Sequence, residues 1–223
     1  MAQSAMLDER GRLALDNIRA GKLVAILRGP DSRYVAAAAR TLIDAGIGVI
    51  EVALTTPGAL GAIQELASVA PAEVSIGAGT VLTARAAAEA VSAGASYFVT
   101  PAVVPEVISA AGQFQVPVLA GALTPTEILA AHRAGAQLVK VFPAALGGPA
   151  YLKWVRDPLP EVPLVPTGGV NLADVSAYLA VGATAVGLGG QLVGDALRGG
   201  DLDQLADRAR QAVAAAASAG PRP

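Results

Sequence analysis

The sequence contains no cysteine and a single histidine, His132. Without cysteine the chain can form no disulfide and perform no thiolate chemistry. One imidazole cannot provide the nitrogen and sulfur ligand sets that zinc and iron sites use, so we expect no metal site. His132 stands beside Arg133 in the last turn of an expected helix, where a cation suits the helix dipole. We therefore expect it to have a structural role.

Long apolar runs, basic runs and aromatic side chains are also scarce. Hydrophobic residues make up 53% of the chain, but Gly, Pro or a charge interrupts each run before the roughly 18 residues that a membrane helix needs. A net charge of −2, with only one Trp, four Tyr and three Phe, does not support nucleic-acid binding. Residues 1–22 carry charges of both signs and no signal-peptide core, so we expect a cytoplasmic protein. The apolar surplus fits an oligomer that covers one face.

Short β-branched runs alternate with alanine-rich helical stretches along the chain. Eight alternating strands and helices predict one parallel sheet closed into a (β/α)8 TIM barrel, with one extra helix at about 7–20 and another at about 202–217. Thr124 and Glu127 are placed for a capping box at one helix start. We expect one domain over 1–223, with a disordered tail at 218–223. The expected strands are 23–28, 48–54, 74–77, 97–100, 116–120, 138–142, 162–166 and 185–188, and the expected helices between them are 34–45, 58–67, 84–93, 105–111, 125–134, 149–156 and 172–181.

Lys140, one of only three lysines, stands in the middle of the apolar run 138–143. Lysine is almost never fully buried without a partner. Burial favours the neutral amine of a lysine, which can attack a carbonyl group. The alternative is an ammonium group that reaches the strand end and meets a carboxylate.

A weak internal repeat places Lys140 relative to the other strands. A glycine suited to the left-handed end of a helix precedes each even-numbered strand, as at Gly46 and Gly135. Five residues beyond these two glycines stand Glu51 and Lys140. Because alternate strands of a barrel fill a common layer, we expect Glu51 and Lys140 to face each other across the barrel. Gly187, at the same offset before strand eight, leaves room between them.

Two readings of this pair remain open, a buried ion pair that fixes the register of the barrel and a catalytic pair. Both residues fall toward the carboxyl ends of their strands, where barrel active sites form, which favours catalysis. Glycine-rich loops at 167–170 and 187–190 follow strands seven and eight, the usual place of a phosphate site in this fold, and Asn171 is available to cap the next helix. The expected phosphate-binding residues are Gly168, Gly169, Gly189 and Gly190.

Three other strand ends carry groups that could serve the same site. Arg28 closes strand one and could hold a carboxylate in a bidentate manner, or could be a surface arginine. Thr80 ends strand three with a hydroxyl group, and Pro101 at the end of strand four is either a stop signal or a wall of the pocket.

A desolvated lysine, a partner carboxylate and a site for small anions suit Schiff-base catalysis on a keto acid. The amine attacks the ketone, and the carboxylate moves protons. A phosphate-barrel isomerase or epimerase would not need the lysine amine, and a phosphosugar-binding protein would bind without turnover.

At these residues the chain resembles the bacterial 2-keto-3-deoxy-6-phosphogluconate (KDPG) aldolases, a family that also includes 4-hydroxy-2-oxoglutarate (KHG) aldolases. The resemblance runs from about residue 22 to residue 212. It rests on the order of the segments 50–52, 77–81, 139–144, 166–170 and 187–189. It implies that Lys140 forms the Schiff base, that Glu51 is the general acid and base, and that the enzyme is a homotrimer without a cofactor. It assigns to the pyruvate part of the substrate the residues Arg28, Thr80, Pro101, Phe142 and Thr167.

The resemblance implies reversible cleavage of KDPG to pyruvate and glyceraldehyde 3-phosphate, or cleavage of KHG to pyruvate and glyoxylate. Thr167 matches a family position linked to stereochemical preference at C4. Some members carry an arginine where Thr55 stands here, which makes Arg28 the expected carboxylate holder. Many carry a phosphate-contacting serine where this chain has Gly190, so the preference for a phosphorylated substrate stays open.

Overall fold

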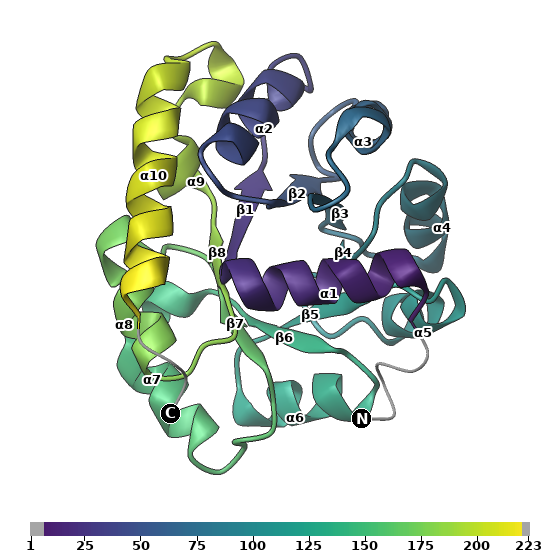
Figure 1. Ribbon diagram of the computed structural model, residues 1–223. Helices are drawn as coiled ribbons and strands as arrows, with labels where there is room; N and C mark the ends of the chain where they lie inside the picture. The colour runs from purple at the N-terminus through teal and green to yellow at the C-terminus, as the bar shows by residue number, and fades with distance from the viewer. Residues whose placement is uncertain (1–6, 220–223) are drawn as a thin grey trace.

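The computed structural model describes residues 7–219, and its centre is a ring of parallel strands (Figure 1). The strands are β1 (Leu23–Leu27), β2 (Val49–Ala53), β3 (Ser75–Gly79), β4 (Phe98–Val99), β5 (Val118–Ala122), β6 (Leu138–Val141), β7 (Leu164–Pro166) and β8 (Val186–Leu188). Neighbours in the chain pair in parallel from β1 to β7, and β8 pairs with β1. A bridge between Thr167 and Gly187 joins the remaining two strands. The predicted (β/α)8 barrel is confirmed.

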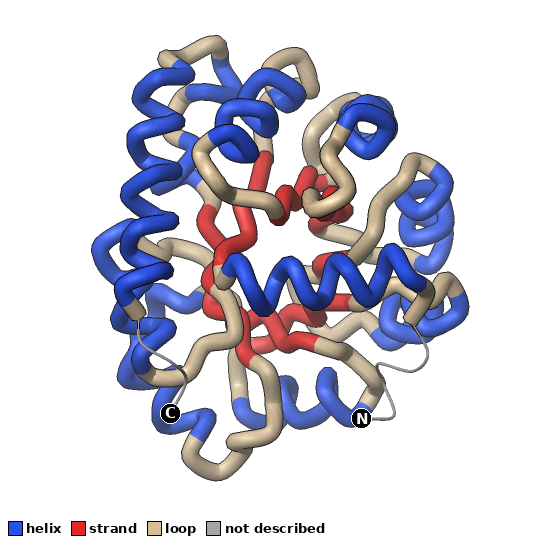
Figure 2. The backbone as a smooth tube through the Cα atoms, in the orientation of Figure 1, coloured by secondary structure: helices blue, strands red, loops and turns tan. Residues whose placement is uncertain are grey.

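Helices surround the ring (Figure 2). After the strands come α2 (Val35–Asp44), α3 (Ala59–Val69), α4 (Ala84–Ser92), α5 (Pro105–Gln113), α6 (Pro125–Arg133), α7 (Gly148–Arg156), α8 (Val175–Ala180) and α9 (Gly190–Val193), with the short 3-10 turns η2 (Ala144–Leu146), η3 (Leu172–Asp174) and η4 (Ala196–Arg198). The extra helices α1 (Glu9–Gly21) and α10 (Leu202–Ser218) lie close to the predicted positions. The predicted capping box of α6 is present, because Thr124 Oγ1 accepts from the Glu127 amide and the Glu127 carboxylate accepts from the Thr124 amide.

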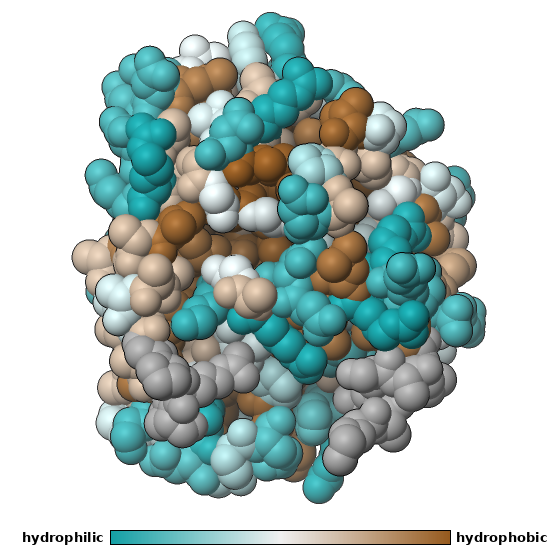
Figure 3. Space-filling view, in the orientation of Figure 1, coloured by the Kyte–Doolittle hydropathy of each residue, from teal (hydrophilic) through white to brown (hydrophobic). Residues whose placement is uncertain are grey.

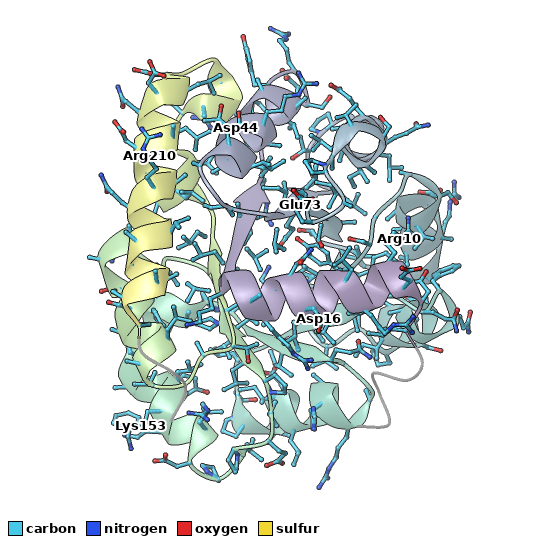
Figure 4. The ribbon with its side chains drawn as sticks, in the orientation of Figure 1. Arg10, Asp16, Asp44, Glu73, Lys153 and Arg210 are labelled. Carbon is cyan, nitrogen blue, oxygen red and sulfur yellow. The ribbon has the colours of Figure 1, made fainter. Side chains whose placement is uncertain are left out.

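Helix α1 lies across one opening of the barrel (Figure 1). Its Asn17 side chain donates to Ser75 Oγ at 3.0 Å, which places it at the amino-terminal end of β3. Its inner face, with Leu15 and Ile18, packs into the apolar cluster inside the barrel. Its outer side is hydrophilic (Figure 3), and Arg10 and Asp16 project from it (Figure 4). The amino-terminal end of the barrel is therefore closed by an amphipathic helix.

Side chains fill the barrel interior in layers, as alternation along each strand requires. The layer next to α1 includes, from the even-numbered strands, Val49, Tyr97, Leu138 and Ala185. Two residues further along the same strands stand Glu51, Val99, Lys140 and Gly187. The shared layer predicted from the five-residue offset is present, and the glycines that define the offset all have left-handed φ angles, 97° at Gly46 and 105° at Gly135 among them.

Several predicted boundaries were wrong. The third strand runs to Gly79 and not to residue 77, and the fifth covers Val118–Ala122 and not 116–120. Glycine is a weak strand former on its own, but Gly79 pairs with β2 and Gly121 with β6, so the neighbouring strands decide the length. The tail prediction was also wrong for Ser218, which belongs to α10, and 220–223 lie outside the described residues.

Asn171 is the N-cap residue that precedes η3, but its side chain accepts no capping hydrogen bond. Its amide nitrogen donates instead to Asp174 Oδ2 at 2.9 Å. The predicted single helix at 172–181 was wrong, because this segment is divided into η3 and α8.

Candidate active site

Lys140 and Glu51 meet inside the barrel as a buried pair. Lys140 is 6% exposed and Glu51 is 1% exposed. The distance from Lys140 Nζ to Glu51 Oε1 is 4.0 Å, too long for a hydrogen bond. Glu51 Oε1 has no hydrogen-bond partner within residues 7–219. A purely structural ion pair is expected to satisfy its buried oxygens, so this unsatisfied oxygen favours a group that acts on a bound molecule.

Glycines on the surrounding strands allow close approaches at this pair and beside it. A Cβ atom at Gly79 would lie 1.9 Å from Glu51 Oε1, so only a glycine allows the carboxylate to lie over β3. Gly121 pairs in register with Lys140 on the next strand. A Cβ atom at Gly187 would lie 2.3 Å from Thr167 Oγ1, so the close approach of β7 and β8 also depends on a missing side chain.

A pocket of about 310 Å³ opens above Lys140. It brings together eight of the predicted site residues, namely Arg28, Lys140, Phe142, Thr167, Gly168, Gly169, Gly189 and Gly190. Lys140 Nζ also lies 5.5 Å from the centre of the Phe142 ring, within cation–π range. Among the described residues, no Asp or Glu lines the pocket. The described pocket lining therefore has positive side chains and no negative one, which suits an anionic ligand.

Arg28 is held at the pocket by Thr80. The Arg28 Nη2 atom donates to Thr80 Oγ1 at 3.0 Å. Thr80 has a φ of 59°, a left-handed conformation that a β-branched residue rarely adopts. Such strain is often found at functional sites. Here it directs the hydroxyl of Thr80 toward the guanidinium group.

The loop after β7 lines the pocket with two glycines whose backbone amides are unpaired among the described residues. Gly168 and Gly169 have φ angles of 90° and 75°, which favour glycine. Within residues 7–219 their amides donate to no backbone carbonyl or side chain. A Cβ atom at Gly168 would lie 2.7 Å from the Phe142 ring. The loop therefore presents free N–H groups beside an aromatic wall, a suitable arrangement for an anion.

Three predicted site residues do not line the pocket. Glu51 lies behind Lys140 and contacts it directly, and Thr80 acts through Arg28. Pro101 is not a wall of this pocket, because the Pro101 backbone lies over Gly121, where a Cβ atom would come within 2.3 Å of its carbonyl carbon.

Two residues of interest were missed from the sequence. Arg198, in η4, lines the pocket beyond the glycine loops, and no motif marks it. Tyr97 lies fully buried below Glu51. Alternation could have found it, because Tyr97 stands two residues before Val99 and so points to the same interior.

Within residues 7–219, no group of three or more His, Cys, Asp or Glu side chains gathers in a way that could hold a metal ion. In the same part of the chain, no helix is long and apolar enough to cross a membrane. His132 lies in the last turn of α6, as expected.

The chain is similar to known proteins over most of its length. The family model "KDPG and KHG aldolase" matches residues 15–207. The chain is 36% identical to the "Probable 2-dehydro-3-deoxy-6-phosphogalactonate aldolase" of Rhizobium meliloti, over 82% of this chain and 87% of that protein. It is 33% identical to the KHG/KDPG aldolase of Escherichia coli K12, over 86% and 91% of the two chains.

A solved structure is similar over nearly the whole chain. The KDPG aldolase of Legionella pneumophila, with pyruvate captured at low pH as a covalent carbinolamine intermediate, superposes with a TM-score of 0.79 at 28% identity and covers 91% of this chain and 97% of that one. The chain therefore belongs to the KDPG and KHG aldolase family, whose members are class I aldolases and carbon–carbon lyases.

Proposed function

We propose that this protein cleaves KDPG to pyruvate and glyceraldehyde 3-phosphate through a Schiff base on Lys140. The observation that carries the proposal is the buried pair, in which Lys140 Nζ lies 4.0 Å from Glu51 Oε1 at the inner end of the pocket. An amine for attack and a carboxylate for proton transfer are the two groups that the reaction needs.

The Lys140 amine adds to the C2 ketone of the substrate, and loss of water from the carbinolamine gives an iminium ion. Glu51 then removes the proton of the C4 hydroxyl group. The C3–C4 bond breaks, its electron pair enters the enamine, and the aldehyde leaves. The protonated Glu51 returns its proton to C3, and water releases pyruvate from the lysine.

The two anionic ends of KDPG have separate places in the pocket. Arg28, oriented by Thr80, suits the carboxylate next to the ketone. The free amides of Gly168 and Gly169 and the guanidinium of Arg198 suit the phosphate. In this assignment Gly189 and Gly190 leave space for the phosphate, and Phe142 and Thr167 flank the pyruvate part.

Two alternative substrates share the same chemistry. KHG is favoured by Gly190, which offers no hydroxyl group to a phosphate. The C4 epimer of KDPG, 2-dehydro-3-deoxy-6-phosphogalactonate, is favoured by the name of the Rhizobium relative. Steady-state measurement of kcat/KM for the three substrates decides among them. We expect KDPG to have the highest value, and a higher value for either alternative contradicts our substrate assignment.

Reductive trapping tests the mechanism itself. Incubation with pyruvate and borohydride is expected to add one reduced pyruvyl group on Lys140, detected by mass spectrometry of the peptide. Lys140→Arg keeps the charge but cannot form the adduct, and serves as the control. If wild-type protein gives no adduct at neutral pH, the Schiff-base mechanism is wrong, and an isomerase, an epimerase or a phosphosugar-binding protein takes its place.

We also propose that the enzyme is a homotrimer. Large apolar side chains are exposed around the segment after β6, with Leu146 at 73% and Trp154 at 67% exposure. Exposed apolar groups of this size are typical of surfaces that another subunit covers.

A further inference from the structure

Tyr97 carries a buried hydroxyl group for which the aldolase mechanism above has no use. Its side chain is fully buried in the interior cluster, between α1 and the Glu51 layer. Its hydroxyl has no hydrogen-bond partner within residues 7–219. A Cβ atom at Gly77 would lie 2.3 Å from Tyr97 Cζ, so the tip of the ring lies directly against β3. An unsatisfied buried hydroxyl is costly and calls for an explanation.

A second unsatisfied oxygen, from Glu51 on β2, lies over the next interior position of β3. Glu51 Oε1 is placed against Gly79, as the tip of Tyr97 is placed against Gly77. Successive interior positions of a strand are only about 6.6 Å apart. One water molecule can bridge two polar atoms in such a space when it has polar partners on both sides.

The two groups are chemically complementary. Burial, and then the negative charge of Glu51, hold the pKa of Tyr97 well above its usual value, so its phenol stays protonated. A protonated phenol is a donor and a carboxylate is an acceptor. Lys140, from β6, is the charged group that faces Glu51 within salt-bridge distance.

Among residues 7–219, Glu51 and Lys140 are the buried charged side chains, so the other elements of this part of the chain bring no buried charge to this space. Helix α1 contributes Leu15 and Ile18 from below, while its charged Asp16 and Arg19 are exposed. On the far side, β5 contributes Leu119 to the same cluster. Tyr97 is therefore the polar group that approaches Glu51 from the floor of the barrel.

We propose that Tyr97 is a positioning residue for Glu51, donating a hydrogen bond through one buried water to Oε1. The inference rests on the proposed Schiff-base function. The bond holds the carboxylate in place below the substrate, in the orientation that accepts a proton from it. Lysine attack does not depend on it, because Tyr97 lies on the side of Glu51 toward α1 and the pocket lies on the other.

The test uses a partial reaction that isolates Glu51. With pyruvate alone in deuterated water, the Schiff base exchanges its methyl hydrogens because Glu51 removes a proton from C3 and returns a deuteron. NMR follows this exchange over a range of pH in wild type, in Tyr97→Phe and in Tyr178→Phe. Tyr178 is a matched control, since its buried hydroxyl donates to the Ala144 carbonyl at 3.2 Å and faces neither Glu51 nor Lys140.

We expect Tyr97→Phe to lower the exchange profile by about tenfold in rate, the effect of one hydrogen bond to a charged group. Borohydride trapping on Lys140 should stay at the wild-type level, and Tyr178→Phe should leave the profile unchanged. The variant loses only an oxygen, so thermal unfolding should show a folded protein.

An unchanged profile in folded Tyr97→Phe overturns the inference and leaves the proposed function intact. An equal fall in rate in Tyr178→Phe also overturns it, because the effect would then be general loosening. Absence of exchange and of adduct in wild type is a failure of the proposed function instead.

Discussion

Gly79 is the position at which one methyl group would reach the Glu51 carboxylate, and Gly79→Ala therefore displaces the carboxylate without changing the chemical identity of either reacting group. The added Cβ would lie 1.9 Å from Glu51 Oε1, whereas ordinary contact begins at 3.4 Å, so the oxygen has to move by about 1.5 Å. Gly79 does not have a left-handed φ, so alanine fits the backbone there.

Misplacement of a catalytic group by about 1 Å can cost about 100-fold in rate. We therefore expect kcat for KDPG cleavage to fall by about 100-fold, while pyruvate trapping on Lys140 remains. Pyruvate release coupled to lactate dehydrogenase measures the first, and mass spectrometry the second. Stability should fall by no more than about 1–3 kcal/mol from overpacking, partly offset by about 0.4–1 kcal/mol from the stiffer unfolded chain.

Gly61→Ala is the control, because a Cβ atom at Gly61 meets nothing within 4 Å. It should leave kcat at the wild-type value. A folded Gly79→Ala protein with wild-type kcat would refute the assignment of Glu51 as the proton carrier. Loss of both turnover and adduct would show that the substitution disturbs more than the carboxylate.

Three further predictions concern the distal end of the pocket, a helix cap and the assembly. Arg198→Gln should raise KM for KDPG about tenfold, because one charged hydrogen bond is lost. Both kcat and pyruvate trapping on Lys140 should stay unchanged. An unaltered KM would show that Arg198 does not bind the phosphate. The amides of Thr124 and Leu123 hold the pKa of Glu127 below its usual value. The Glu127 carboxylate therefore stabilises the folded protein above its unfolded-state pKa of about 4.3. This contribution is lost as the pH falls through its lower pKa in the folded state. The Tm difference between wild type and Glu127→Gln should shrink as the pH falls through this range. A Tm difference that stays constant with pH would contradict the prediction. Analytical sedimentation of wild type should give a mass of about 66 kDa, for three chains of 22.1 kDa. The variant Trp154→Glu should give mainly the mass of a single chain. A wild-type mass of 22.1 kDa would rule out the trimer.

The barrel and the pair could be predicted from the sequence because both depend on short-range periodicity. A glycine that ends a helix fixes the start of the next strand, so one offset relates Glu51 to Lys140. The length of β3 could not be predicted, since Gly79 pairs only because β2 lies beside it.

The outer part of the site was harder to predict than its centre. Arg198 reaches the pocket through the conformation of the loop after α9, which no residue pattern marks. Pro101 was assigned to the pocket by resemblance, but the absence of a side chain at Gly121 allows its backbone to lie over β5 instead. Contacts between distant loops decide such positions.

Helix α1 and the packed layer above it leave the pocket with a single mouth, at the carboxyl ends of the strands. In the proposed reaction, pyruvate stays covalently bound at the inner end while the aldehyde half lies nearer the mouth. The aldehyde must therefore depart first and pyruvate last. Such an ordered release makes pyruvate a competitive product inhibitor and the aldehyde a noncompetitive one, and the closed end of the barrel reinforces the order that the covalent bond imposes.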